Sequence, residues 1–468
     1  MSVYKTLAEN KAFLKARLPI GNSFDIIERD LAIANRDGYL VFVDGFAKDD
    51  VMIHVIRSLQ TEPPTKGELI PHLLTKTIPF IEAEQCGDFD TLEQMLLSGA
   101  LLMFVDGEET AIIIDAREYP VRSIEEADTE KVTNGPKDGF VETIIFNTAM
   151  IRRRVRDRNL CFEMTNVGES SKTDVCLAYL KGKADEKYLR DLRKKLDGIQ
   201  VDSLVMAHNS LEELLLPRRW FNPLPQIRYT QRPDIAASYL QEGHVLIMVD
   251  TSPSVMITPT TFFYYTQYAE DFIQTPVVGT YYSLARILAL LTAQFLVPAW
   301  LLLAEHISPP QWLSFIGMKE PGPIPLLIQF LLLEFGFDLL KMSSMHSPTY
   351  MGGTFGIIGA LLLGDFAIKV GVFVPESIFY MAVTIIASYC IPNSDLTYAV
   401  RLFRLLLLIA TGLLGIWGFI GSIILILILM LSTKTMDSKR PYLWPLIPLN
   451  IKALGNMLIR KKVMNRRS

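Results

Sequence analysis

The sequence predicts an α/β soluble region of two similar tandem subdomains, followed by an all-α, multi-pass transmembrane domain. Three observations lead there: half of the 468 residues are hydrophobic, the charges divide unevenly along the chain, and a strand–turn–strand pattern recurs at an offset of 144 residues. We expect subdomain 1 at residues 1–135 and subdomain 2 with its connector at residues 136–278. The transmembrane domain is expected at residues 279–435, and a basic cytoplasmic tail at residues 436–468.

The net charge of −4 conceals two halves of opposite sign. Residues 1–278 hold 31 Lys/Arg and 42 Asp/Glu, whereas residues 279–468 hold 15 and 8, so the halves carry about −11 and +7. A nucleic-acid-binding protein concentrates basic charge on a folded domain, and here the polar half is acidic. We therefore expect no nucleic-acid partner. The four cysteines form neither a disulfide framework nor a C-x-x-C pair.

In the first subdomain, residues 29–43 indicate a strand, a turn at Asn35-Arg36-Asp37-Gly38 and a second strand. Residues 49–59 follow as a helix. A second helix at residues 90–97 precedes residues 98–113 (SGALLMFVDGEETAII), where an apolar strand ends in Val-Asp before a polar turn and another strand. The Asp-Gly pairs are turn signals because glycine tolerates a positive φ.

The second subdomain repeats this order. Residues 161–180 indicate two strands around a turn at residues 168–172, and residues 185–196 a helix. A helix at residues 234–241 then precedes residues 242–257 (EGHVLIMVDTSPSVMI), which match residues 98–113. The economical interpretation is a duplicated unit, β-β-α followed by α-β-β. The alternative is a chance likeness between common α/β patterns.

Between the two halves of the repeat lies a basic helix at residues 141–156. An arginine run of this kind is either a solvated helix face or, in acidic surroundings, an inter-domain or inter-subunit clamp. The clamp candidates are Arg152, Arg153, Arg154 and Arg156.

The membrane half contains runs long enough to cross about 30 Å of hydrocarbon as helices. We expect spans at residues 287–304, in the glycine-rich stretch around residues 350–370, at residues 377–394, and at residues 405–436, of which 405–432 are uncharged. A soluble core helix is rarely apolar on all sides.

Residues 324–342 are long enough to span but carry Glu334 and Asp338 on one helical face. One interpretation is an amphipathic helix lying at the membrane interface. The other is a span whose intramembrane acids face protein or water, because carboxylates in contact with lipid are costly.

Positive charge follows the last expected span, which places the tail in the cytoplasm. The acidic half carries no apolar signal run and is expected on the same side. Both termini on one side require an even number of crossings. Four crossings with a non-crossing 324–342 segment fit best, and six is the alternative.

One apolar stretch gathers small and polar residues at helical spacing. One interpretation is that the small residues permit close helix packing; the alternative is that this face lines a pore in a symmetric oligomer. The pore-lining candidates are Gly352, Thr354, Gly356, Gly359 and Asp365.

Motifs for catalysis are missing from the sequence. It has no phosphate loop, G-x-S-x-G elbow or H-E-x-x-H, and its six histidines have no ligand spacing. We therefore expect no enzyme, no metal site and no cofactor.

Several ordered blocks resemble the A subunits of the GerA family of bacterial spore germinant receptors, over nearly the whole chain. The blocks are Asp106-Gly107, residues 122–126 (RSIEE), 135–143 (GPKDGFVET), 147–154 (NTAMIRRR), 222–234 (NPLPQIRYTQRPD), 391–393 (IPN) and 441–443 (PYL). Within the family, residues 364–376 and 441–445 are more similar to the stage V sporulation protein AF branch.

The resemblance implies a multi-pass protein of the spore inner membrane with both termini cytosolic. It also implies a homo-oligomeric ring that conducts cations during germination. The implied partners are membrane lipid and other germination membrane proteins, either receptor subunits of the B and C types or a small membrane partner. Two other functions stay open. A secondary transporter would favour inverted repeats, and a membrane-tethered scaffold would recruit germination partners without conducting ions.

Overall fold

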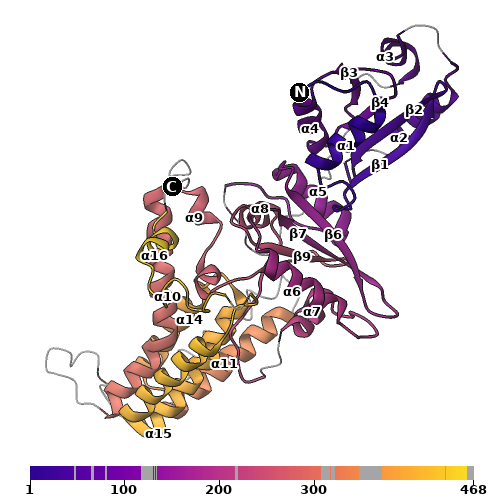
Figure 1. Ribbon diagram of the computed structural model, residues 1–468. Coiled ribbons are helices and arrows are strands. Elements are labelled where there is room, and N and C mark those ends of the chain that lie inside the picture. Colours follow the sequence, from indigo (N-terminus) through magenta and orange to yellow (C-terminus); the bar gives the residue numbers. More distant parts are fainter. Residues whose placement is uncertain are drawn as a thin grey trace. The chain divides into compact units, whose positions relative to one another are not determined.

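The protein is described from a computed structural model, in which the chain forms two compact units (Figure 1). Unit 1 comprises residues 1–218 and 227–259, and unit 2 comprises residues 219–226 and 260–468. The structure describes residues 1–46, 49–64, 68–79, 82–116, 130, 132, 134–216, 220–306, 317, 322–346, 371–437 and 439–460.

Unit 1 begins with an antiparallel sheet of five strands in the order β1-β2-β4-β5-β3. The strands are β1 (Ile26–Ile33), β2 (Arg36–Val43), β3 (Ala83–Cys86), β4 (Leu101–Val105) and β5 (Ala111–Ile114). The helices are α1 (Leu7–Arg17), α2 (Asp49–Thr61), α3 (Leu69–His72), the π-helical turn η1 (Leu73–Thr77) and α4 (Phe89–Leu97).

Helices cover both faces of this sheet. Leu14 of α1 and Phe89 of α4 belong to a core cluster on one face, and Val55 of α2 and Leu73 of η1 to a cluster on the other. Strand β4 lies between these layers, and all of its residues are buried. This explains why its sequence, LLMFV, is continuously apolar rather than alternating.

The second sheet has the same order and direction, β6-β7-β9-β10-β8. Its strands are β6 (Leu160–Val167), β7 (Thr173–Leu180), β8 (Arg228–Thr230), β9 (Val245–Val249) and β10 (Val255–Thr258). Its helices are α5 (Ile144–Arg154), α6 (Glu186–Asp197), α7 (Ala207–Leu215) and α8 (Pro233–Gln241).

The strand register repeats as well. Met103 pairs with Ile112 in the first sheet, and Ile247 pairs with Met256 in the second, each shifted by the 144 residues seen in the sequence. The prediction of two similar subdomains is therefore confirmed. We call the first sheet with its helices subdomain 1 and the second subdomain 2.

One local prediction was wrong, and two strands were missed. The first hairpin turns at Ala34 and Asn35, which have φ values of 49° and 62°, and Gly38 lies inside β2 opposite Leu31. A Cβ at Gly38 would approach Ile33 Cδ1 to 2.6 Å, so the glycine serves close packing rather than the turn. The edge strands β3 and β8 were not expected, since three or four residues show too little alternation.

The Val-Asp ends of β4 and β9 cap a helix in each subdomain. Asp106 accepts a hydrogen bond from the backbone N–H of Leu7 at 2.9 Å, and Asp250 accepts one from Ile144 at 3.1 Å. An asparagine inside each capped helix, Asn10 or Asn147, bonds the backbone N–H and C=O of the residue three positions before the helix, Tyr4 or Val141. These side chains satisfy amide groups that a helix start leaves free.

Unit 2 is helical in its described part. Its elements are η2 (Phe262–Thr266), α9 (Glu270–Ile273), α10 (Pro276–Leu301), η3 (Leu302–His306), α11 (Leu326–His346), α14 (Pro375–Tyr389), α15 (Ser394–Ser432) and α16 (Ile451–Leu458). Two described segments, Pro276–His306 and Ser394–Ser432, are long and apolar enough to cross a membrane, with mean hydropathies of 2.1 and 2.7.

Helix α15 is a hairpin rather than one rod. Gly415 has φ 58° and ψ −134°, which interrupts the helix. The chain then folds back. The evidence is one cluster in which Phe419, Ile423 and Ile426, which follow Gly415, pack with Phe403 and Leu396, which precede it. The prediction of a single span at residues 405–436 is therefore wrong: residues 394–414 and 416–432 are two helical segments (Figure 1).

The described helices of unit 2 run between two ends. At the connector end, which holds residues 222–226 and 260–266, Asn222 bonds Thr433 at 2.8 Å and Tyr442 donates to Pro225 O at 2.8 Å. At the far end, Leu326 N–H donates to Glu305 at 3.2 Å, and Gly415 lies beside His306. Segments α10 and 394–414 run towards the far end, and α11, α14 and 416–432 run back.

Candidate functional site

A cluster of four charged side chains lies between helices of unit 2, with two of the side chains buried in the bundle and two nearer its surface. Glu334 of α11 accepts hydrogen bonds from Arg404 of α15 at 2.5 and 3.1 Å, and both side chains are at most 4% exposed. Arg401, one turn earlier in α15, lies 3.5 Å from Glu334 and pairs with Asp338. We call these four residues the ionic cluster, and its formal charge is zero.

Arg404 joins four helices. Besides Glu334 of α11, its guanidinium donates to Ala293 O of α10 at 2.8 Å and to Ser388 Oγ of α14 at 3.3 Å. A planar guanidinium with five N–H donors suits this bridging role better than an ammonium group. The arginine therefore fixes the helices of the bundle against one another.

The ionic cluster continues towards the connector end as a ladder. Lys341 of α11 lies 4.3 Å from the ring of Tyr398 of α15, one step beyond the Asp338–Arg401 pair. Acidic or basic residues on α11 thus meet their partners on 394–414 in antiparallel order. Such pairing is what allows ionisable groups to lie in an apolar bundle.

The sequence predicted half of this cluster. Glu334 and Asp338 were singled out as intramembrane acids, and the structure buries Glu334 while leaving Asp338 36% exposed. Arg401 and Arg404 were missed. The available signal was their spacing of three residues, which places two cations on one helical face opposite two acids on another.

The five pore-lining candidates, Gly352, Thr354, Gly356, Gly359 and Asp365, lie outside the described residues.

The arginine run of α5 lies where the two subdomains meet. Arg152 is fully buried and donates through Nε to Asp25 at 2.8 Å, from the segment before β1. The same guanidinium donates to Leu160 O at 3.1 Å and lies 5.0 Å from the ring of Phe162. A buried, hydrogen-bonded ion pair thus links a helix of subdomain 2 to subdomain 1.

The other arginines of the run are placed differently. Arg154 is half-buried and pairs with Asp138 within subdomain 2. Arg153 and Arg156 are exposed. Each of the two alternatives for the arginine run therefore matches part of it: Arg152 bridges the subdomains, and two of its neighbours lie on a solvated face.

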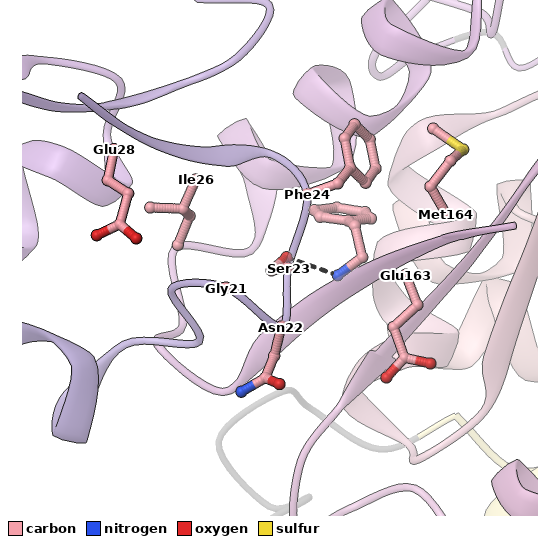
Figure 2. Close-up of a pocket in the computed structure, with 9 residues that line it drawn as sticks. Gly21, Asn22, Ser23, Phe24, Ile26, Glu28, Glu163 and Met164 are labelled. Atoms are coloured by element: carbon pink, nitrogen blue, oxygen red, sulfur yellow. Dashed lines mark hydrogen bonds between the residues drawn. The ribbon is translucent and has the colours of Figure 1, made fainter.

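Backbone bonds reinforce this junction. Phe24 N–H donates to Phe162 O at 3.0 Å, and Phe162 N–H donates to Ser23 Oγ at 2.8 Å, so the chain before β1 pairs with the edge strand β6 (Figure 2). Beside it lies an open pocket of about 590 Å³ lined from both subdomains. Its two acids already have partners: Glu28 bonds Tyr39 and Lys15, and Glu163 bonds Arg193.

Elsewhere in the described part of unit 1, the buried Arg228 and Arg232 are paired: Arg228 lies 3.0 Å from Glu130, and Arg232 lies 2.7 Å from Asp234. Burial lowers the pKa of His208, whose Nδ1 lies 2.6 Å from Ser252 Oγ. Burial also raises the pKa of the Cys176 thiol, which is a core side chain of β7. Among the described residues, no group of three or more His, Cys, Asp and Glu side chains could hold a metal ion.

Comparisons with known proteins agree on one family. A sequence model of the family described as "Bacillus/Clostridium GerA spore germination protein" matches residues 14–468. Stage V sporulation protein AF of Bacillus subtilis (strain 168) is 38% identical, covering 98% of this chain and 93% of the relative. Spore germination protein KA of the same organism is 30% identical, covering 98% and 84%.

A solved structure is also similar. The N-terminal domain of the A subunit of the Bacillus megaterium spore germinant receptor GerK3 matches at 26% identity with a TM-score of 0.44, covering 56% of this chain and 98% of that domain. The family match spans nearly the whole chain, including both sheets and the ionic cluster. This chain therefore belongs to the GerA family of spore germination proteins.

Proposed function

We propose that this chain is a subunit of an oligomeric ion channel that releases cations during spore germination. The observation that carries the proposal is the ionic cluster, a charge-neutral group of four side chains, with the Glu334–Arg404 pair buried, in an apolar helical bundle of a germination-family protein. A protein that only anchored a soluble scaffold would need no charged groups at that depth, because each one is costly there. The cluster instead supports an assembled bundle with fixed helix positions.

The pore itself is assigned to the glycine-rich stretch. Gly352, Thr354, Gly356, Gly359 and Asp365 would line a water path when several copies surround a common axis. Similarity to stage V sporulation protein AF over nearly all of both chains favours an amplifying channel of that branch over a receptor A subunit. The proposed partners are other germination membrane proteins, of the B and C receptor types or a small membrane partner.

The proposed topology is multi-pass in the spore inner membrane, with both termini cytosolic. Segments α10, α11, α14, 394–414 and 416–432 would each cross, and the expected span at residues 350–370 would be the sixth. Six crossings replace the four favoured by sequence because α15 is a hairpin and because α11 buries Glu334 in the bundle. Each change adds one crossing, so the two together keep the number even.

Ion flux through proteoliposomes containing the purified chain tests the channel. Gly356→Val and Asp365→Asn should each change the flux at least several-fold, whereas Gly421→Val is the matched control. Within the described part of the chain, no heavy atom lies within 4 Å of a Cβ placed at Gly421. Unchanged flux in both test variants would remove the pore assignment and favour a scaffold, and flux that saturates with a co-transported solute would favour a transporter.

Cysteine labelling in intact membranes tests the topology. Native Cys390, exposed near the connector end, should react with an impermeant reagent only from the cytosolic side. A cysteine at Gly371, at the far end, should react only from the opposite side. Reaction of both positions from one side would contradict six crossings.

A further inference from the structure

The segment from Pro441 to Arg460 leaves the bundle at the connector end, and we call it the tail segment. It begins at a fixed point: Tyr442 is fully buried, donates to Pro225 O at 2.8 Å, and accepts from Phe262 N–H at 2.8 Å through its own carbonyl. Its other end returns to the start of α10, where Arg460 N–H donates to Thr280 Oγ1 at 3.1 Å and its guanidinium bonds Phe272 O. The tail segment is therefore held against unit 2.

Between these two points, several apolar side chains of the tail segment are exposed. Helix α16 contains no buried residue, although Asn450 caps it by accepting from Ala453 N–H at 3.0 Å. Among the described residues, Ile451 of α16 and the apolar side chains that flank the helix are uncovered, which favours a contact partner for them. The exposed apolar side chains, with their exposed fractions, are Leu446 43%, Ile447 40%, Leu449 63%, Ile451 75% and Ile459 53%.

The sequence from residue 438 onward, which includes the tail segment, carries only basic charges. Residues 438–468 contain eight Lys/Arg and no Asp/Glu. Four of the cations lie in the described part of the chain: Lys439, Arg440, Lys452 and Arg460. On α16, Ile451 and Leu458 share one face, whereas Lys452 and Asn456 lie on another, so apolar and cationic contacts point in different directions.

We propose that the tail segment lies on the membrane face and binds anionic phospholipid headgroups. Its exposed apolar side chains would enter the headgroup–acyl boundary, while Lys452 and the preceding Lys439 and Arg440 contact lipid phosphates. Trp444, stacked 4.7 Å from Arg440, and exposed Tyr281 and Tyr282 of α10 are residue types that favour this boundary. An acidic protein surface would match the charge but not the uncovered apolar side chains. The inference rests on the proposed membrane topology of unit 2.

The test uses the full chain in vesicles, with an environment-sensitive dye on a cysteine at Ile451 in a Cys86→Ser, Cys390→Ser background. Dye emission should shift to the blue, and spin-labelled lipid should quench it at least about twofold more in phosphatidylcholine vesicles containing phosphatidylglycerol than in phosphatidylcholine alone. The matched position is Asn456, on the polar face of α16, where both changes should be small.

Charge-reversal variants distinguish an effect of the basic tail from an effect of the protein's total net charge. Lys452→Glu, Lys461→Glu and Lys462→Glu together should abolish the phosphatidylglycerol effect at residue 451. Lys181→Glu, Lys187→Glu and Lys194→Glu together make the same charge change on exposed sites of unit 1 and should leave it unchanged.

Two outcomes would overturn the proposal. Dye at residue 451 that reports water in anionic vesicles would mean that the apolar face stays uncovered. Protection that is equal in neutral vesicles and grows with protein density would mean that a second copy covers it. Ion flux measured in the same vesicles keeps the two proposals apart: intact flux without dye insertion counts against the tail contact alone, and dye insertion without flux counts against the channel alone.

Discussion

Lys15 of α1 and Arg152 of α5 hold equivalent positions in the two subdomains, at the same distance along the helix from the capped residues Leu7 and Ile144. Lys15 pairs with Glu28 at 2.9 Å on the surface, with side chains 48% and 36% exposed. Arg152 pairs with Asp25 at 2.8 Å, with side chains 0% and 2% exposed. One duplicated helix position has thus become a surface contact in one copy and the centre of the junction in the other.

Removing Lys15 or Arg152 is expected to give the largest difference in stability between the two subdomains. Arg152→Met leaves Asp25 buried without its charge partner and should cost about 3–5 kcal/mol. Lys15→Met, the matched control, should cost less than about 1 kcal/mol because solvent screens its pair. Hydrogen exchange on the full-length protein, followed in peptides covering residues 20–28 and 158–166, measures both.

A second variant separates the lost ion pair from lost packing. Asp25→Leu added to Arg152→Met removes the unpaired charge and should recover much of the protection from exchange. Equal exchange in Arg152→Met and Lys15→Met would show that burial of the pair does not stabilise the junction.

The two subdomains share an aspartate that caps a helix, and replacing that aspartate tests its contribution in each of them. Asp106→Ala and Asp250→Ala should each destabilise their own subdomain by about 1–2 kcal/mol, because each leaves a helix N–H without its acceptor. Faster exchange should be confined to α1 and its sheet in the first case, and to α5 and its sheet in the second. Asparagine at either position keeps an acceptor and is the control; loosening of both subdomains by one variant would mean that they do not open independently.

The residue after each cap tests a smaller difference. Gly107 has φ 87°, and the equivalent Thr251 has φ 64°, which is unfavourable for a β-branched side chain. Thr251→Gly should therefore stabilise subdomain 2 by about 1 kcal/mol. Gly107→Thr should destabilise subdomain 1 by a similar amount, since a Cβ there meets nothing closer than 3.7 Å and only backbone strain remains. Hydrogen exchange measured over a range of temperatures reports the stability of each subdomain. A change of the same sign in both variants would refute the explanation by backbone strain.

The smallest effect is expected from pH. Burial lowers the pKa of His208 in subdomain 2, so the folded state favours the neutral ring. Its contribution is complete above the unfolded pKa of about 6.5 and is lost as the pH falls through the lower folded value. Acidification from neutrality should therefore loosen α7 of subdomain 2 in exchange measurements. His208→Gln should remove this pH dependence, and an unchanged profile in that variant would assign the effect to another group.

How far the sequence could predict this fold depended on loop length. Strands β4 and β5 match β9 and β10 at a constant offset of 144, so their repeat was visible. Strands β1 and β2 match β6 and β7 only loosely, because a turn at Ala34 and Asn35 is replaced by the longer turn at residues 168–172. An insertion of that kind shifts the offset and hides the likeness.

Some residues of the candidate site could likewise be predicted from the sequence, and others could not. Glu334 and Asp338 were predictable because acids within an apolar stretch are rare. Arg404 was not, because its partner lies 70 residues away and only the folded bundle brings the two together. Gly415 was missed for a different reason: a glycine inside a long apolar run is usually a packing residue, and only its backbone angles reveal a reversal.

The hairpin at Gly415 also bears on how the protein is made. Residues 394–414 carry Arg401 and Arg404, whereas residues 416–432 carry no charge at all. In the proposed membrane arrangement, the uncharged segment emerges from the ribosome immediately after the charged one and can supply the apolar free energy for inserting both as a pair. Glu334 and Asp338 are synthesised earlier, so the acidic partners of Arg404 and Arg401 precede both arginines into the bilayer.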